Sequence, residues 1–141
     1  MKVVVVYTTH CKDAKLLADD MARYARTYAR PITDFDFQED VDLLVLGFEE
    51  YPCFKDKELE TFIHQLSRQH IKNLALFNLF CFKNKQMDKV IDLCRQQDLP
   101  LMRETYSCKK ALKSKCYLSD DIISGGREYI EDMVNICNHY Y

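Results

Sequence analysis

The sequence predicts an α/β protein in which helices cover both faces of a parallel β-sheet. Short runs of Val, Leu and Phe alternate along the chain with longer segments whose apolar residues recur every three or four positions. Uniformly apolar runs are typical of strands buried on both faces, and the longer period is typical of amphipathic helices. Strands that alternate with helices favour right-handed crossovers and therefore a parallel sheet.

Composition fits one globular domain that spans residues 1–141. Hydrophobic residues make up 48% of the chain, and the net charge of −2 offers no basic surface for nucleic acid. The apolar run near the amino terminus is shorter than the core of a signal peptide, and no later run reaches membrane-spanning length. We therefore expect a cytoplasmic protein that binds neither nucleic acid nor membrane.

The first elements follow directly from the pattern. Residues 3–7 are uniformly apolar and predict a strand at the centre of the sheet. Apolar residues then recur at helical spacing from Ala14 to Tyr28, and Pro31 is expected to end this helix because the residue before a proline is disfavoured in helical geometry. Residues 32–37 alternate and predict a short edge strand.

The same alternation of elements continues to the end of the chain. Further strands are predicted at residues 41–48, 74–82 and 101–108, which gives five in total. Helices are predicted around residues 59–66, 87–94 and 129–137. The last helix is expected to be entered through Ser124, Gly125 and Gly126. We find no repeat or linker that divides the domain.

A ligand site is expected where the first strand ends. In open α/β sheets the binding crevice lies outside the carboxyl ends of the strands. The residues in that place are polar or reactive: Thr8, Thr9, His10, Cys11, Lys12 and Asp13.

Three segments of the sequence resemble the flavodoxin family. VVVVYTTHCKDAKLLA is similar to the family's opening strand and phosphate loop, LLVLGFEEYPCFKDKELETFI to its third strand and first ring-binding loop, and LALFNLFCFKNKQMDKVIDLC to its fourth strand and second ring-binding loop. The resemblance implies a flavodoxin-like three-layer sandwich with strand order 2-1-3-4-5. It also implies FMN at the switch point beside strands one and three.

The phosphate loop departs from the family pattern S/T-x-T-G-x-T. Thr9 fits the first hydroxyl and Ala18 the alanine that follows the pattern, but Cys11, Lys12 and Ala14 replace Thr, Gly and Thr. The resemblance implies that Thr9, Lys12 and the nearby backbone hold the phosphate, and that aromatic residues of the other two loops flank the ring. The implied FMN-binding residues are Thr8, Thr9, His10, Cys11, Lys12, Asp13, Ala14, Gly47, Phe48, Tyr51, Phe54, Asn78, Phe80 and Phe82.

Cysteines gather at the same predicted edge. The chain has seven, an odd number with no CxxC pair, which argues against a disulfide scaffold. Cys11, Cys53, Cys81 and Cys108 follow or end predicted strands, and His10 lies beside Cys11. Three interpretations stay open: small buried side chains, a reactive thiol, or a metal site formed by Cys11, Cys53 and His10.

The sequence leaves two functions open. The first is a redox protein that uses FMN to pass electrons to a partner protein, or that serves as the flavin subunit of a reductase. The second is a flavodoxin fold that has lost FMN and acts as a binding or scaffold module. No acidic pair or Ser–His constellation indicates hydrolysis, and whether the protein is an enzyme is left open.

Overall fold

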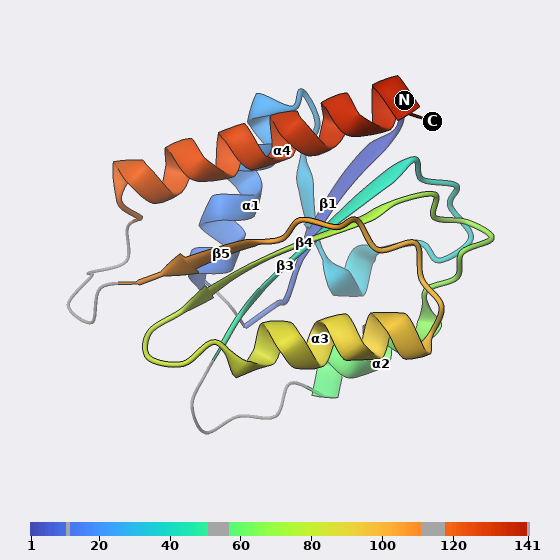
Figure 1. Ribbon diagram of the computed structural model, residues 1–141, viewed down its shortest axis with the longest axis horizontal. Coiled ribbons are helices and arrows are strands. Elements are labelled where there is room, and N and C mark those ends of the chain that lie inside the picture. Colours follow the sequence, from blue (N-terminus) through green and yellow to red (C-terminus); the bar gives the residue numbers. More distant parts are fainter. Residues whose placement is uncertain (11, 51–56, 111–117, 141) are drawn as a thin grey trace.

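A five-stranded parallel sheet forms the centre of the protein (Figure 1). The computed structural model describes residues 1–10, 12–50, 57–110 and 118–140. The strand order is β2-β1-β3-β4-β5, and all four pairings are parallel. The strands are β1 (Val3–Tyr7), β2 (Ala29–Pro31), β3 (Leu43–Glu49), β4 (Leu74–Phe80) and β5 (Tyr106–Lys109). This confirms the predicted α/β class and strand order.

In the described part of the chain, four helices cover the sheet in two layers. They are α1 (Lys12–Tyr24), α2 (Lys57–Gln65), α3 (Lys85–Gln96) and α4 (Asp120–Tyr140). Figure 1 shows α1 and α4 on one side of the sheet and α2 and α3 on the other. Within the described part of the chain, no helix combines the length and apolar character needed to cross a membrane.

The side chains of the central strands divide between two cores. In β3, Leu43 and Val45 face α1 and α4, whereas Leu44 and Leu46 face α2 and α3. Every residue of β3 is buried, as the uniformly apolar run predicts. Apolar burial on both faces is the main favourable contribution to the stability of such a sheet.

The edge strand lies earlier than the sequence predicts. Residues 32–37 do not form a strand; β2 ends at Pro31, and a 3₁₀ turn follows at Ile32–Asp34. Ile32 and Phe35, three positions apart, turn into the core instead, where the Phe35 ring meets the Phe62 ring edge-on at 5.6 Å. The first helix ends at Tyr24 rather than near Tyr28, and Arg26 has a φ of 61°, which takes the chain out of helical geometry.

The last strand is also shorter than predicted. β5 begins at Tyr106, and Leu101 makes only an isolated bridge to Leu74. Leu74, the first residue of β4, exchanges backbone hydrogen bonds with Pro100 and Met102, and the chain then leaves the sheet until β5 begins. Likewise, β4 stops at Phe80, two residues before the predicted boundary.

Two glycines lie inside α4 and not at its entrance, which corrects the sequence prediction. The helix begins at Asp120, and the backbone N–H of Ile122 donates to the Ser119 hydroxyl at 3.3 Å. A Cβ at Gly125 would lie 2.3 Å from the Tyr106 hydroxyl oxygen, and one at Gly126 would lie 2.9 Å from Leu17 Cδ1. These positions need glycine because α4 packs directly against β5 and α1.

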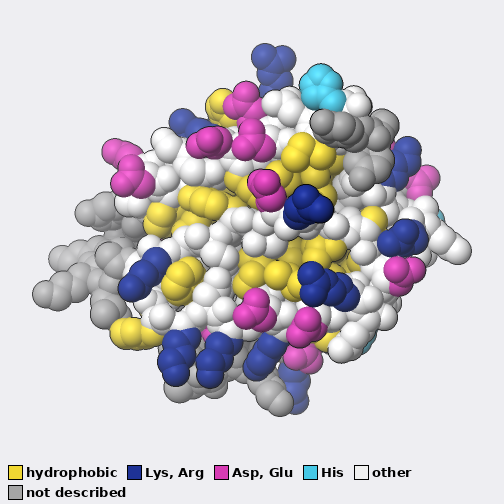
Figure 2. Space-filling view, viewed as in Figure 1, with side chains coloured by type: hydrophobic (Ala, Val, Ile, Leu, Met, Phe, Trp, Pro, Cys, Tyr) yellow, Lys and Arg dark blue, Asp and Glu magenta, His cyan; other side chains and the backbone are white. Residues whose placement is uncertain are grey.

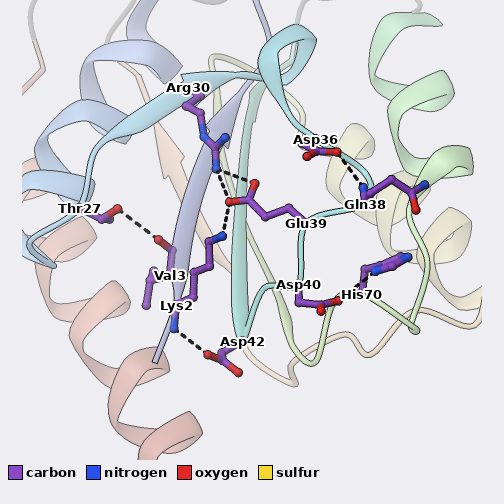
Figure 3. Close-up of polar contacts among 10 residues, drawn as sticks. All are labelled: Lys2, Val3, Thr27, Arg30, Asp36, Gln38, Glu39, Asp40, Asp42 and His70. Atoms are coloured by element: carbon purple, nitrogen blue, oxygen red, sulfur yellow. Dashed lines mark hydrogen bonds and ion pairs between the residues drawn. The ribbon is translucent and has the colours of Figure 1, made fainter.

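Ion pairs tie the first residues to the segment before β3. Figure 3 shows Glu39 between Lys2 and Arg30. Lys2 Nζ lies 2.6 Å from Glu39 Oε1, and Arg30 Nη2 lies 3.0 Å from Glu39 Oε2. The hydrogen bond from Lys2 lowers the pKa of Glu39, so this carboxylate stays ionised at neutral pH. The contacts hold the edge strand against the centre of the sheet.

Candidate functional site

The carboxyl ends of the central strands form one edge of the sheet, which we call the mouth. Backbone hydrogen bonds continue the ladder there: Thr8 N–H donates to the Gly47 carbonyl, Glu50 N–H to Leu79, and Lys110 N–H to Phe80. The segments after β1, β3, β4 and β5 therefore start from fixed positions at the mouth.

A half-buried lysine joins two carboxylates at this edge. Lys110 Nζ lies 2.5 Å from Asp13 Oδ2 and 2.8 Å from Glu49 Oε2. Asp13 comes from the first turn of α1 and Glu49 from the end of β3, so the lysine that follows β5 links three elements. Burial acts to lower the pKa of Lys110, but the hydrogen bonds to Asp13 and Glu49 outweigh burial and raise it. We call these three residues the Lys110 triad.

The Lys110 triad has a net charge of −1 when its members are ionised. Glu49 is 5% exposed, and its second oxygen, Oε1, has no hydrogen-bond partner among the residues that the structure describes. A buried acceptor without a donor is costly. The triad is therefore short of hydrogen-bond donors, not of acceptors.

Another carboxylate contacts the loop after β1. The Thr9 hydroxyl lies 2.8 Å from Glu58 Oε1 and 3.1 Å from Oε2, and as the O–H group it is the donor. Glu58 lies in the first turn of α2. The hydroxyl that the family resemblance assigns to the phosphate is therefore directed to a carboxylate of this chain.

A ring of three polar side chains fixes the start of the β4–α3 turn. Asn78 Nδ2 donates to Asn84 Oδ1 at 2.7 Å, Asn84 Nδ2 donates to Ser107 Oγ at 2.9 Å, and Ser107 Oγ donates to Asn78 Oδ1 at 2.8 Å. Asn78 is fully buried. Because each member is satisfied by the other two, the ring holds the turn between β4 and α3 in place.

A hollow of about 230 Å³ lies beside that turn. It is lined by Glu50, Cys81, Phe82, Lys83 and Lys85. Glu50 accepts the backbone N–H of Lys85 at 3.1 Å, which fixes the end of β3 to the first turn of α3. Phe82 is 64% exposed, so its ring can be reached by a ligand that stacks on it.

The other residues named from the sequence differ widely in burial. Thr8 and Ala14 are fully buried, and His10 and Lys12 are exposed. Phe48 is also fully buried, in the core beneath α2 and α3, and Phe80 is half-buried. Cys11, Tyr51 and Phe54 lie outside the described residues.

Gly47 has a packing role that the sequence does not reveal. A Cβ at this position would lie 2.1 Å from Phe77 Cζ. The Phe77 ring therefore lies directly over the Gly47 backbone, on the face that α1 and α4 cover. Space for this ring is enough to explain the glycine, and its expected role beside a flavin stays a prediction.

The described residues fit the two ends of FMN unequally. The exposed Phe82 ring beside the hollow offers a face on which a flat flavin ring can stack. A phosphate needs hydrogen-bond donors and positive charge, yet Thr9 donates to Glu58, and the positive charge of Lys110 is neutralised by Asp13 and Glu49. The ring end fits, and the phosphate end does not.

The cysteines expected at this edge do not form one cluster in the described part of the chain. Cys108 points into the core beside α4 and is buried, whereas Cys81 borders the hollow and is half-buried. No group of three or more His, Cys, Asp or Glu side chains suited to a metal ion occurs among the described residues. The proposed Cys11, Cys53 and His10 site includes two cysteines outside them.

Alkylation should distinguish these thiols. Burial raises the pKa of Cys94 to about 12 and that of Cys108 to about 11, so both are protonated and shielded at neutral pH. We expect Cys81 to be labelled by iodoacetamide well before Cys94 and Cys108, as read by mass spectrometry of digested samples. Equal labelling rates for the three thiols in the folded protein would contradict this placement.

Comparison with known proteins supports the fold of the chain but shows neither its family nor its function. No protein-family model matches the sequence, and no curated protein matches it. Among solved structures, a flavodoxin from the domain Archaea superposes with a TM-score of 0.77 at 15% identity, covering 99% of this chain and 100% of that chain. The chain thus has a flavodoxin-like fold.

Two further structures extend the comparison. A flavodoxin from Streptococcus pneumonia TIGR4 has a TM-score of 0.71 at 12% identity and covers 96% of this chain and 99% of that one. Rubredoxin oxygen:oxidoreductase from Desulfovibrio gigas has a TM-score of 0.74 at 10% identity, with 97% of this chain matched to 36% of that chain. The same fold therefore occurs as a whole protein and as part of a longer one.

Proposed function

We propose that the protein is a flavodoxin-like redox protein whose mouth binds a flavin ring. The observation that carries the proposal is the hollow of about 230 Å³ beside the exposed Phe82 ring, at the carboxyl ends of β3 and β4. This is where ligands bind in doubly wound sheets. A bound flavin supplies reversible electron transfer, and the protein supplies the ring's position and electrostatic surroundings.

The surface around the hollow suits an acidic redox partner. Lys83 and Lys85 line the hollow and are exposed. Figure 2 shows Lys and Arg side chains gathered along the lower edge of the molecule. Charge complementarity accelerates association between proteins, and the effect decreases with salt. We propose that donor and acceptor proteins dock here through acidic groups.

Flavin titration tests the proposal. We expect the protein to quench riboflavin fluorescence. Phe82→Ala should weaken binding about tenfold, because removing an aromatic side chain that stacks on the flavin ring costs roughly 1–1.5 kcal/mol of binding free energy. Tyr28→Ala is the matched control. Tyr28 is 74% exposed and directly precedes β2, an edge strand separated from β3 by β1.

The control separates stacking at the mouth from a general loss of exposed aromatic surface. Equal affinities for Phe82→Ala and the parent protein would remove Phe82 from the site. Absence of quenching by any flavin would overturn the proposed function.

The second candidate is a fold that has lost its flavin and acts as a binding module. The observation that favours it is the mutual pairing of polar groups after β1, where Thr9 meets Glu58 and Asp13 meets Lys110. A colourless protein that no flavin stabilises against heat is the outcome that this second function predicts.

A further inference from the structure

We infer that the mouth discriminates against phosphate and selects a flavin whose side chain ends in a hydroxyl, as in riboflavin, over FMN. This inference rests on the proposed function, because it specifies which flavin the same site takes. It follows from the charges and hydrogen-bond directions around the loop after β1.

Carboxylates from three elements lie around this loop. Glu58 approaches Thr9 from α2, and Asp13 lies in the first turn of α1 with Glu49 close by through Lys110. Among the described residues, Lys110 pairs with Asp13 and Glu49 and not with Glu58, so the acids outnumber this cation. A phosphate dianion placed among them meets like charge, whereas a neutral hydroxyl does not.

The positively polarised amino terminus of α1 already has a negative charge beside it, the Asp13 carboxylate. The amino terminus of a helix attracts an anion, and Asp13 supplies a carboxylate in the first turn of α1. Lys12 and Lys57 are also near in sequence, but both side chains are exposed, where water and salt screen their charge. They offset the acidic groups only weakly.

The hydrogen-bond directions favour the same ligand. Carboxylate oxygens accept hydrogen bonds, and the Glu58 carboxylate beside Thr9 is only half-buried, so a ligand hydroxyl can donate to it. A ribityl hydroxyl can donate to a carboxylate, whereas an ionised phosphate presents only acceptors. A side chain that ends in O–H therefore complements this end of the mouth, and one that ends in phosphate does not.

Parallel titrations with riboflavin and FMN test the inference. We expect riboflavin to bind at least about tenfold more tightly at low ionic strength, and the difference to shrink as salt is added. Equal or tighter binding of FMN would overturn the inference while leaving the proposed function in place. Binding of neither flavin would overturn both.

Charge-neutralising variants locate the cause. Asp13→Asn and Glu58→Gln each remove one charge and keep the side chain's shape, so each should raise FMN affinity at least about threefold and change riboflavin affinity less. Asp132→Asn makes the same change in net charge on an exposed position of α4 and should leave the ratio of the two affinities unchanged. Thermal unfolding checks that each variant is folded, and Glu58→Gln stands as the test if Asp13→Asn is unstable. An unchanged ratio in a folded variant contradicts the inference.

Discussion

Replacing Lys110 with methionine is expected to lower the free energy of unfolding by about 3 kcal/mol. Methionine keeps the apolar stem but leaves Asp13 and Glu49 facing each other without the cation that joins them. The Asp13 and Glu49 side chains are only 11% and 6% exposed. Removing one partner of such a buried ion pair costs a few kcal/mol, because the remaining charge loses its compensation. Urea unfolding at neutral pH measures the change.

Lys109→Met is the matched control for this prediction. Lys109 precedes Lys110 in the chain but is exposed, so its replacement should change stability by less than about 0.5 kcal/mol. If the two variants unfold at the same urea concentration, the Lys110 triad does not hold the mouth together.

A methyl group at Gly47 is expected to destabilise the protein by about 3 kcal/mol. The new Cβ would lie 2.1 Å from Phe77 Cζ, and Phe77 is fully buried. Overpacking of this kind forces side chains from their preferred rotamers or shifts the backbone. The free energy of unfolding of Gly47→Ala measures the cost.

A second substitution shows whether this contact is the cause. Phe77→Leu removes the ring atoms that collide with the new methyl group. The Gly47→Ala/Phe77→Leu protein should therefore be more stable than the sum of the two single changes predicts. Additive effects would mean that the glycine is required for another reason.

The fold was predictable because it depends on local patterns. The runs that became β1 and β3 are apolar at nearly every position, and this alone places them at the centre of a parallel sheet. The edges were less predictable. Residues 32–37 alternate like a strand, but Ile32 and Phe35 both pack into the core, and a 3₁₀ turn forms there instead.

Much of the site depended on contacts that no local pattern encodes. Glu49 and Lys110 were not singled out from the sequence, and they meet across 61 positions of the chain. The burial of Phe48 could have been predicted, because successive side chains of a strand point to opposite faces. Phe48 therefore lies on the same face as Leu44 and Leu46, which α2 and α3 cover. Asn78 lies near the carboxyl end of β4, as predicted, and its side chain donates to Asn84 in the turn before α3.

The most direct test of the central claim is an amide NMR titration with lumiflavin. This molecule is the flavin ring without a ribityl or phosphate group, so its binding reports the ring site alone. The account predicts that the amide signals of Glu50, Cys81 and Lys83 shift to saturation, while those of Asp42 and Asn73, near the opposite ends of β3 and β4, stay in place. Shifts confined to the opposite edge, or none at saturating lumiflavin, would contradict a flavin-binding mouth.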